Sequence, residues 1–326
     1  MANPGETADP HVTVAICTWN RAQSLARTLD SLVAMKKPPG LHWEVVIVDN
    51  NSTDTTAQCI QSYVTQLPVV SVFEKQAGVV YARNAAIRNS RGKYILWTDD
   101  DVVVQEDWLI AYLDAFERHP QVALFGGPIY ADFEGQVPTW LEKGWEAVKI
   151  AYCHNDMSDE EIPLVEHPPG FLPYGANFAI RSIEQKKELF DLRLGYMPSR
   201  PYIAEETGMM KKVLSSGAKG MWIPAARVRH INGQDRLTLK YVRGYYERQG
   251  RTWKASGPSL PGRRFFGSPL WLWRQVIESG AQYFYARIFN EPSVWLTKLA
   301  TYSVKRGYLK EVRLERFGGP IKISQV

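Results

Sequence analysis

Hydrophobic and polar positions alternate in blocks along the first 230 residues and predict strands and helices in turn. Apolar residues three or four apart, such as Leu25, Leu29 and Leu32, predict helices. Consecutive apolar runs, which predict buried strands, lie at residues 12–18, 43–48, 69–73 and 94–98. Strands that alternate with helices of this length form βαβ units, so we expect an α/β fold with a parallel sheet flanked by helices.

The regular alternation stops after residue 130. Residues 136–175 form a long irregular stretch, and such connections inside a compact domain are usually functional or mobile. The remaining expected elements are strands at 174–180 and 218–223, a helix at 205–214, and helices at 237–249, 270–277 and 293–306. Gly307 is expected to end the last helix. We therefore divide the chain into a domain of residues 1–235 and a helical region of residues 236–326.

Three consecutive carboxylates, Asp99, Asp100 and Asp101, follow the apolar run at 94–98. Open α/β sheets bind ligands at the carboxyl ends of their strands. Adjacent like charges repel unless they share a cation, and oxygen ligands suit a hard ion such as Mg²⁺ or Mn²⁺. The simpler alternative is a solvated acidic turn that caps a helix beginning near Glu106.

Two further polar clusters follow predicted strands, Thr18-Trp19-Asn20 and Asp49-Asn50-Asn51. Each alone is more often a turn or a cap, but three clusters at corresponding strand ends predict a binding site along one sheet edge. The chain has no G-x-G-x-x-G after a strand and no G-x-x-x-x-G-K-[ST]. A nucleotide bound here must therefore be held by side chains and a metal.

Composition narrows the class of protein. The 326 residues are 45% hydrophobic and 22% charged, which is typical of a soluble globular protein, and a net charge of +5 gives no reason to expect a nucleic-acid partner. The three cysteines show no C-x-x-C spacing, which favours a reducing compartment. The polar N-terminus and the lack of a long apolar run predict a cytoplasmic protein, with attachment to the inner face of the membrane as an alternative.

In this order, the motifs resemble those of the family 2 glycosyltransferases, which are inverting enzymes of the GT-A fold. The resemblance covers roughly residues 12–251 and rests on Thr18-Trp19-Asn20-Arg21, residues 48–54, Gly78 with Ala82-Arg83-Asn84, Asp99-Asp100-Asp101, Gly175-Ala176-Asn177, Glu205-Glu206 and residues 224–230. It implies a Rossmann-like, mostly parallel sheet with a helical C-terminal extension. It also implies a metal-dependent transferase that moves a sugar from a nucleotide-sugar, with UDP favoured, to a saccharide or a polyprenyl-linked saccharide.

The resemblance implies that Asp49 binds the nucleotide base with help from Arg83, and that Thr18, Asn20 and Asn51 add hydrogen bonds to the nucleotide. The uracil N3–H is a donor, which suits a carboxylate acceptor. Thymine and guanine also present a ring N–H, so UDP is favoured by analogy alone. The alternatives are a helix-capping turn for Asp49 and a solvated helix residue for Arg83.

The resemblance also implies a metal site. Asp99 would contact the ribose or the metal, and Asp101 would ligate a metal that bridges the diphosphate, whereas Asp100 is ambiguous because the triplet lets the register slip. His230 resembles a late histidine that completes the metal site in part of the superfamily, although a histidine near a strand end is usually structural. An imidazole beside carboxylates favours Mn²⁺ slightly over Mg²⁺.

Inversion requires a general base that deprotonates the acceptor hydroxyl. Glu206 occupies the family's base position, where many members have aspartate, and Glu205 is the alternative. Both residues could instead compensate charge at the start of a helix. Asn177, Trp140 and Trp145 are expected to flank the sugar or the acceptor, with burial in the core an equal alternative for the tryptophans.

The C-terminal region combines aromatic residues with many lysines and arginines, which suits a membrane interface, a homodimer interface or packing on the main domain. Two other functions stay open. A sugar-phosphate nucleotidyltransferase would need a glycine-rich basic loop after the first strand, where this chain has Thr18-Trp19-Asn20-Arg21. A catalytically silent sugar- or membrane-binding module would not need the acidic triplet and the Glu205-Glu206 pair.

Overall fold

The computed structural model describes residues 10–165, 172–197, 200–257 and 261–317. The chain divides into two compact units. The first unit runs to Asp132 and resumes over Cys153–Arg200 and Ala204–Ile231. The second unit comprises Phe133–Tyr152, Pro201–Ile203 and the chain from Asn232 onward.

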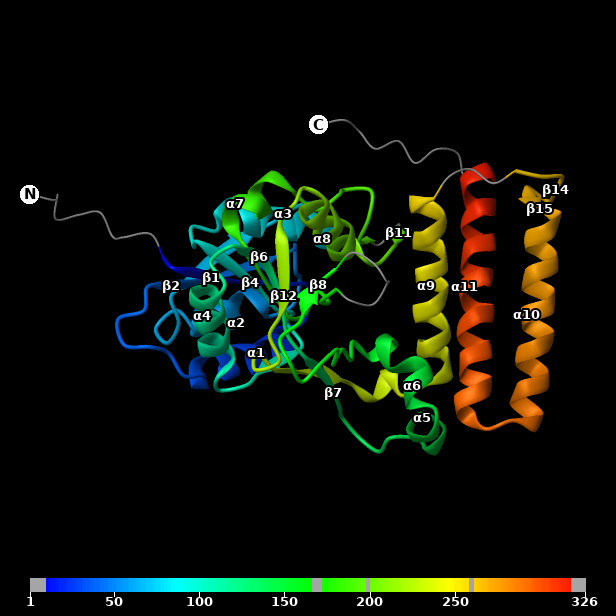
Figure 1. Ribbon diagram of the computed structural model, residues 1–326, viewed down its shortest axis with the longest axis horizontal. Coiled ribbons are helices and arrows are strands. Elements are labelled where there is room, and N and C mark those ends of the chain that lie inside the picture. Colours follow the sequence, from blue (N-terminus) through cyan, green and yellow to red (C-terminus); the bar gives the residue numbers. More distant parts are fainter. Residues whose placement is uncertain (1–9, 166–171, 198–199, 258–260, 318–326) are drawn as a thin grey trace, which may run out of the picture. The chain divides into compact units, whose positions relative to one another are not determined.

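A mixed sheet forms the centre of the first unit (Figure 1). Within the described residues its eight strands, in spatial order, are β3 (Val69–Phe73), β2 (Trp43–Asp49), β1 (Val12–Thr18), β4 (Tyr94–Trp97), β9 (Phe178–Arg181), β6 (Val122–Gly126), β12 (Lys219–Trp222) and β8 (Pro163–Leu164). The β1, β2, β3 and β4 strands pair in parallel, as predicted. By contrast, β9 is antiparallel to both β4 and β6, and β8 is antiparallel to β12.

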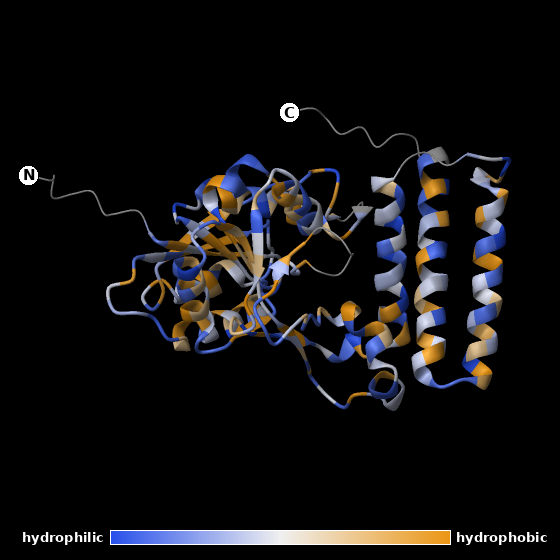
Figure 2. Cartoon of the chain, in the orientation of Figure 1, coloured by the Kyte–Doolittle hydropathy of each residue, from blue (hydrophilic) through white to orange (hydrophobic). Residues whose placement is uncertain are grey.

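Helices cover both faces of this sheet, so that its inner strands β1, β2 and β4 are buried on both sides. Along β1, Val14 and Ile16 belong to one apolar cluster and Ala15 to the other, as the two-residue period of a strand requires. The first cluster is completed by α1 (Ala22–Ala34), α2 (Thr56–Ser62) and α4 (Trp108–Arg118), and the second by α3 (Val79–Asn89) and α8 (Glu205–Ser215). Figure 2 shows the hydrophobic residues concentrated in the strands of this sheet.

A second, smaller sheet has the order β5 (Val102–Val104), β13 (Val228–Asn232), β7 (Ile129–Phe133). Strand β5 begins directly after the three aspartates, and it pairs antiparallel with β13 so that His230 lies opposite Val102. This pairing brings a histidine from far along the chain to the acidic triplet.

Three long helices, α9 (Leu239–Ser256), α10 (Leu270–Phe289) and α11 (Pro292–Phe317), dominate the second unit, and α11 packs against both of the others (Figure 1). Shorter elements of this unit are α5 (Thr139–Lys143), α6 (Trp145–Val148) and the 3₁₀ turns Lys149–Tyr152 and Gln234–Arg236. Two-residue strand pairs occur in the described chain as β10 (Tyr196–Met197) with β11 (Arg200–Pro201), and β14 (Arg264–Phe265) with β15 (Ser268–Pro269). In the described part of the chain, no helix combines the length and the apolar character that a membrane crossing requires.

The prediction that Gly307 ends the last helix is wrong, because α11 continues to Phe317. A Cβ at Gly307 would lie 2.0 Å from the carbonyl oxygen of Glu247, and one at Gly250 would lie 1.9 Å from that of Val304. These glycines therefore allow α9 and α11 to approach closely. The prediction that the preceding helix stops at Ile277 is also wrong, since α10 runs to Phe289 and Tyr283 in its later turns stacks on Tyr302 of α11.

Candidate active site

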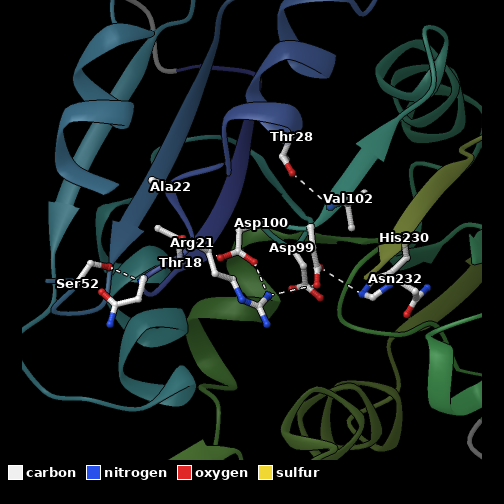
Figure 3. A network of polar contacts seen from close by, with 12 residues as sticks. Thr18, Arg21, Ala22, Thr28, Ser52, Asp99, Asp100, Val102, His230 and Asn232 are labelled. Carbon is white, nitrogen blue, oxygen red and sulfur yellow. Dashed lines mark hydrogen bonds and ion pairs between the residues drawn. The ribbon is translucent and has the colours of Figure 1, made fainter. Parts of the chain in front are cut away.

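The acidic triplet lies at the carboxyl end of β4, in the tight turn that leads into β5 (Figure 3). Asp99, Asp101 and His230 each offer a ligand atom, and these atoms all lie within 4.8 Å of one another. His230 Nε2 is 3.2 Å from Asp101 Oδ1, and both side chains are largely buried. Two carboxylates and an imidazole at this spacing form a donor set suited to Mn²⁺ or Mg²⁺.

The middle carboxylate, Asp100, points to other partners. Its Oδ2 accepts the Thr18 hydroxyl at 2.7 Å, and its Oδ1 accepts Nη1–H of Arg21 at 2.9 Å (Figure 3). Burial raises the pKa of Asp100 to about 6, against the opposing effect of Arg21 and with a further upward contribution from Asp101. In this geometry Asp99 and Asp101 face His230, whereas Asp100 connects the turn to the end of β1.

Arg21 is a site residue for which the sequence analysis gave no role. Its Nη1 also lies 3.2 Å from Asp101 Oδ2, so one guanidinium bridges two of the three aspartates while its side chain stays 47% exposed. A lone arginine after an Asn gives no sequence signal of this role. The bridge depends on the β1 and β4 ends being neighbours in the sheet.

Arg83 is buried on α3 among carboxylates, which excludes the alternative of a solvated helix residue. Its Nη1 lies 3.3 Å from Glu205 Oε1 and 3.6 Å from Glu206 Oε2, and its Nη2 lies 3.6 Å from Asp99 Oδ1. The guanidinium also lies over the aromatic rings of Trp97 and Phe190. Arg83 thus links the metal-ligand candidates to the glutamate pair.

The glutamate pair begins α8, and its two members have different surroundings. Glu205 is buried, and this burial, together with repulsion from Glu206, raises the pKa of Glu205 to about 8. Glu206 is 18% exposed, and its Oε1 accepts the Gly175 N–H at 3.3 Å. A Cβ at Gly175 would lie 2.6 Å from Arg83 Nη2 and 2.8 Å from Glu206 Oε1, so the glycine permits this close approach.

Of the residues expected at the nucleotide, Asp49 is buried at the end of β2 and its Oδ1 accepts the Ser52 N–H at 2.9 Å. One carboxylate oxygen therefore does stabilise the turn that the capping alternative predicted. Asn20 Oδ1 accepts N–H groups of Thr53 at 2.7 Å and Asp54 at 3.3 Å, which joins the loops after β1 and β2. Asn51 is exposed with a φ of 64°, a left-handed conformation that Asn tolerates.

The three residues expected near the sugar or the acceptor have different surroundings. Asn177 is fully buried, where its Nδ2 donates to two carbonyl groups and its Oδ1 accepts from Trp108 and Tyr112. This full set of internal hydrogen bonds gives Asn177 a structural role. Trp140 and Trp145 belong to the second unit, where Trp140 lies near Trp295 and Trp145 packs on Phe133 and Tyr152.

The model of the family described as glycosyl transferase family 2 matches residues 13–181, which include both strand-end clusters and the acidic triplet. The chain belongs to this family. Among curated relatives, the succinoglycan biosynthesis protein ExoM of Rhizobium meliloti is 29% identical over 143 residues, which are 43% of this chain and 45% of that protein. A validoxylamine A glucosyltransferase of Streptomyces hygroscopicus subsp. limoneus is 34% identical over 115 residues, which are 34% of this chain and 25% of that protein. The matched regions span less than half the length of these two relatives.

Solved structures share the fold at low sequence identity. The mannosyltransferase PcManGT of Pyrobaculum calidifontis, solved with GDP-Man and Mn²⁺, superposes with a TM-score of 0.56 at 16% identity and covers 95% of this chain and 87% of its own. S. aureus TarS 1–349, solved with UDP, gives a TM-score of 0.54 at 16% identity and covers 97% and 94%. The likeness confirms the predicted GT-A fold with a helical C-terminal extension.

Proposed function

We propose that this protein is a metal-dependent, inverting glycosyltransferase that moves a sugar from a UDP-sugar to a hydroxyl group of a saccharide. The observation that carries the proposal is the joint placement of Asp99, Asp101 and His230 within 4.8 Å, with Arg83 linking Asp99 to the glutamate pair. Family membership supports the transferase class. The relatives' names, which include succinoglycan biosynthesis, support a saccharide acceptor in polysaccharide assembly.

A divalent cation held by Asp99, Asp101 and His230 would supply positive charge to the diphosphate leaving group. The donor set fits such an ion, since Asp99, Asp101 and His230 offer ligand atoms within 4.8 Å of one another and adjacent carboxylates repel unless they share a cation. Mn²⁺ accompanies the donor in the PcManGT structure, which supports Mn²⁺ for this chain without deciding it against Mg²⁺.

The chain's own residues supply the other steps. Glu206 accepts the proton of the acceptor hydroxyl, because it is partly exposed whereas Glu205 is buried, and its contacts with Gly175 and Arg83 hold its carboxylate in place. Glu205 stays mostly protonated near neutral pH, which makes it the poorer base. The second carboxylate oxygen of Asp49 accepts the uracil N3–H, and the exposed Asn51, two residues further along the chain, adds a hydrogen bond to the nucleotide. Thr18 ends the neighbouring strand β1 and would contact the nucleotide from there, although its hydroxyl also donates to Asp100.

An acceptor carried on a polyprenyl lipid would put the reaction at the cytoplasmic face of a membrane. The competing nucleotidyltransferase function is less well supported, because Thr18 and Arg21 engage Asp100 instead of forming a glycine-rich phosphate loop. A silent binding module would have no need for an aligned base and metal site.

Thermal denaturation with nucleotides tests the donor class. UDP together with Mn²⁺ is expected to raise the melting temperature, since ligand at 100 times its Kd adds about 2.7 kcal/mol of stability. Neither UDP alone nor Mn²⁺ alone should raise the melting temperature as much as the two together. Stabilisation by GDP alone would overturn the assignment of Asp49, and stabilisation by no nucleotide–metal pair would overturn the proposed donor site.

A further inference from the structure

One face of the second unit combines exposed apolar side chains with a row of basic side chains. On α10, the exposed fractions of Ile277, Phe284 and Ile288 are 68%, 62% and 73%. With Trp273, these residues are spaced four, seven and four positions apart, so they form one stripe along the helix. Contiguous exposed apolar surface of this kind marks an interaction site.

Beside this stripe, a groove of about 550 Å³ lies between α10 and α11. Trp273 and Val276 line it from α10, and apolar residues of α11, including Leu309, complete its lining. Three basic residues of α11 also line the groove, namely Arg306, Lys310 and Arg313. They are spaced four and three positions apart and therefore lie on one side of α11. We name the stripe and the basic row together the α10–α11 face: Trp273, Ile277, Phe284, Ile288, Arg306, Lys310 and Arg313.

Charge is concentrated in this part of the chain. Residues 261–315 hold nine lysines and arginines and four acidic residues, a net charge of +5 that equals the net charge of the whole protein. Three of the acidic residues pair with other basic residues: Glu278 with Arg274, Glu311 with Arg251 and Glu315 with Lys254. The groove lining itself contains no acidic side chain among the described residues, although Arg306 also pairs with Glu247 of α9 at 3.4 Å and stays 49% exposed. The α10–α11 face is therefore positively charged and apolar at once.

We propose that the α10–α11 face docks on the surface of a bilayer that contains anionic phospholipids. Ile277, Phe284 and Ile288 enter the interfacial region, and the basic row contacts lipid phosphates across the groove. A second copy of the chain fits this face less well. A two-fold dimer would bring the same basic row to both sides of the interface, with no acidic row to receive it. The proposal does not depend on the transferase chemistry.

Co-sedimentation of the full chain with vesicles tests the proposal. The probes are vesicles of phosphatidylcholine alone and of phosphatidylcholine mixed with phosphatidylglycerol, at physiological ionic strength. The wild-type protein is expected to bind the mixed vesicles and to bind the neutral ones far more weakly. Each basic residue near an anionic surface strengthens binding about fivefold, so the variant R306Q/K310Q/R313Q should bind on the order of 100-fold more weakly.

The matched control removes the same charge elsewhere, as K186Q/K187Q/K219Q, three exposed lysines of the first unit. This control should bind the mixed vesicles nearly as well as the wild-type protein. A second variant, F284S/I288S, removes exposed apolar groups without changing charge and should also weaken binding. Circular dichroism and the melting temperature verify that each variant is folded.

Three results would overturn the proposal. The first is no preference of the wild-type chain for anionic vesicles. The second is an equal loss of binding in the control and in R306Q/K310Q/R313Q. The third is a wild-type chain that ignores vesicles but forms a dimer in light scattering that F284S/I288S abolishes, which would assign the face to a second copy.

Discussion

Replacing Glu206 by glutamine tests the assignment of the base. The substitution keeps the shape of the side chain and an oxygen that can accept the Gly175 N–H, and Arg83 keeps Glu205 and Asp99 as partners. Nucleotide binding should therefore survive. A general base contributes roughly 10²- to 10⁴-fold to a rate, so kcat should fall by that factor, equivalent to about 3 to 5 kcal/mol in the barrier.

The matched variant is Glu205→Gln, which removes the other member of the pair. Because the pKa of Glu205 is raised to about 8, this side chain is mostly neutral at pH 7, and its replacement should lower kcat by less than about tenfold. The assay is release of UDP from a sugar donor in the presence of Mn²⁺ and acceptor, with UDP binding measured separately by calorimetry. An E206Q enzyme with wild-type kcat, or a larger loss in E205Q than in E206Q, would refute the assignment. Loss of UDP binding in E206Q would show that Glu206 positions the site and does not act as its base.

Two further predictions concern stability. Ala204 precedes the glutamate pair with φ 72° and ψ 30°, a strained left-handed conformation for alanine. Because glycine adopts this conformation without strain, A204G should raise the free energy of unfolding by roughly 0.5 kcal/mol in urea denaturation, and a lower urea midpoint would contradict this. The raised pKa of Glu205 also makes the stability of the protein depend on pH. The contribution of the protonated Glu205 carboxyl to the free energy of unfolding is fully present below pH 4.5, its pKa in the unfolded chain, and is lost as the pH rises through about 8, its pKa in the folded protein. Between these limits, the melting temperature of the wild-type protein should therefore fall relative to that of E205Q, and an unchanged difference between the two from pH 5 to pH 8.5 would contradict the burial argument.

Most of the central sheet could be predicted from the sequence, because a strand buried on both faces must be apolar throughout. The strands β1, β2 and β4 are of this kind, and their residues are recognisable one strand at a time. The edge strand β3 is only partly buried but is still a run of mainly apolar, β-branched residues. The direction of β9 was not predictable in this way. Its four residues look the same in either direction, and its antiparallel pairing with β4 and β6 depends on where the long preceding connection returns to the sheet.

The sequence indicated which residues gather at the candidate site, but it did not indicate most of the contacts between them. Clustering at strand ends brought Asp99 and Asp101 to attention, but the approach of His230 depends on the pairing of β5 with β13, which joins segments more than a hundred residues apart. The bridge from Arg21 to Asp100 has the same non-local origin. Asn177 was expected at the substrate because its motif resembles the family, whereas its burial depends on Trp108 and Tyr112 of α4.

Helix lengths in the second unit were underestimated for a related reason. Glycines are poor helix formers in isolation, so Gly307 suggested a break. In the folded unit, each glycine provides space for a neighbour, Tyr302 beside Gly280 and the Glu247 backbone beside Gly307. Packing between the helices therefore outweighs the low helix propensity of glycine.

The most direct test of the proposed metal site is a titration of Mn²⁺ into the protein with UDP present, in which electron paramagnetic resonance counts the free ion. The wild-type chain should bind one Mn²⁺, and D101N should bind it more than about tenfold more weakly, since a ligand is lost at a site where even supporting contacts contribute 10- to 100-fold. The control D107N alters an aspartate that is 67% exposed and pairs with Lys36, and it should bind Mn²⁺ like the wild-type protein. Equal Mn²⁺ affinity in D101N and the wild-type chain would contradict the account.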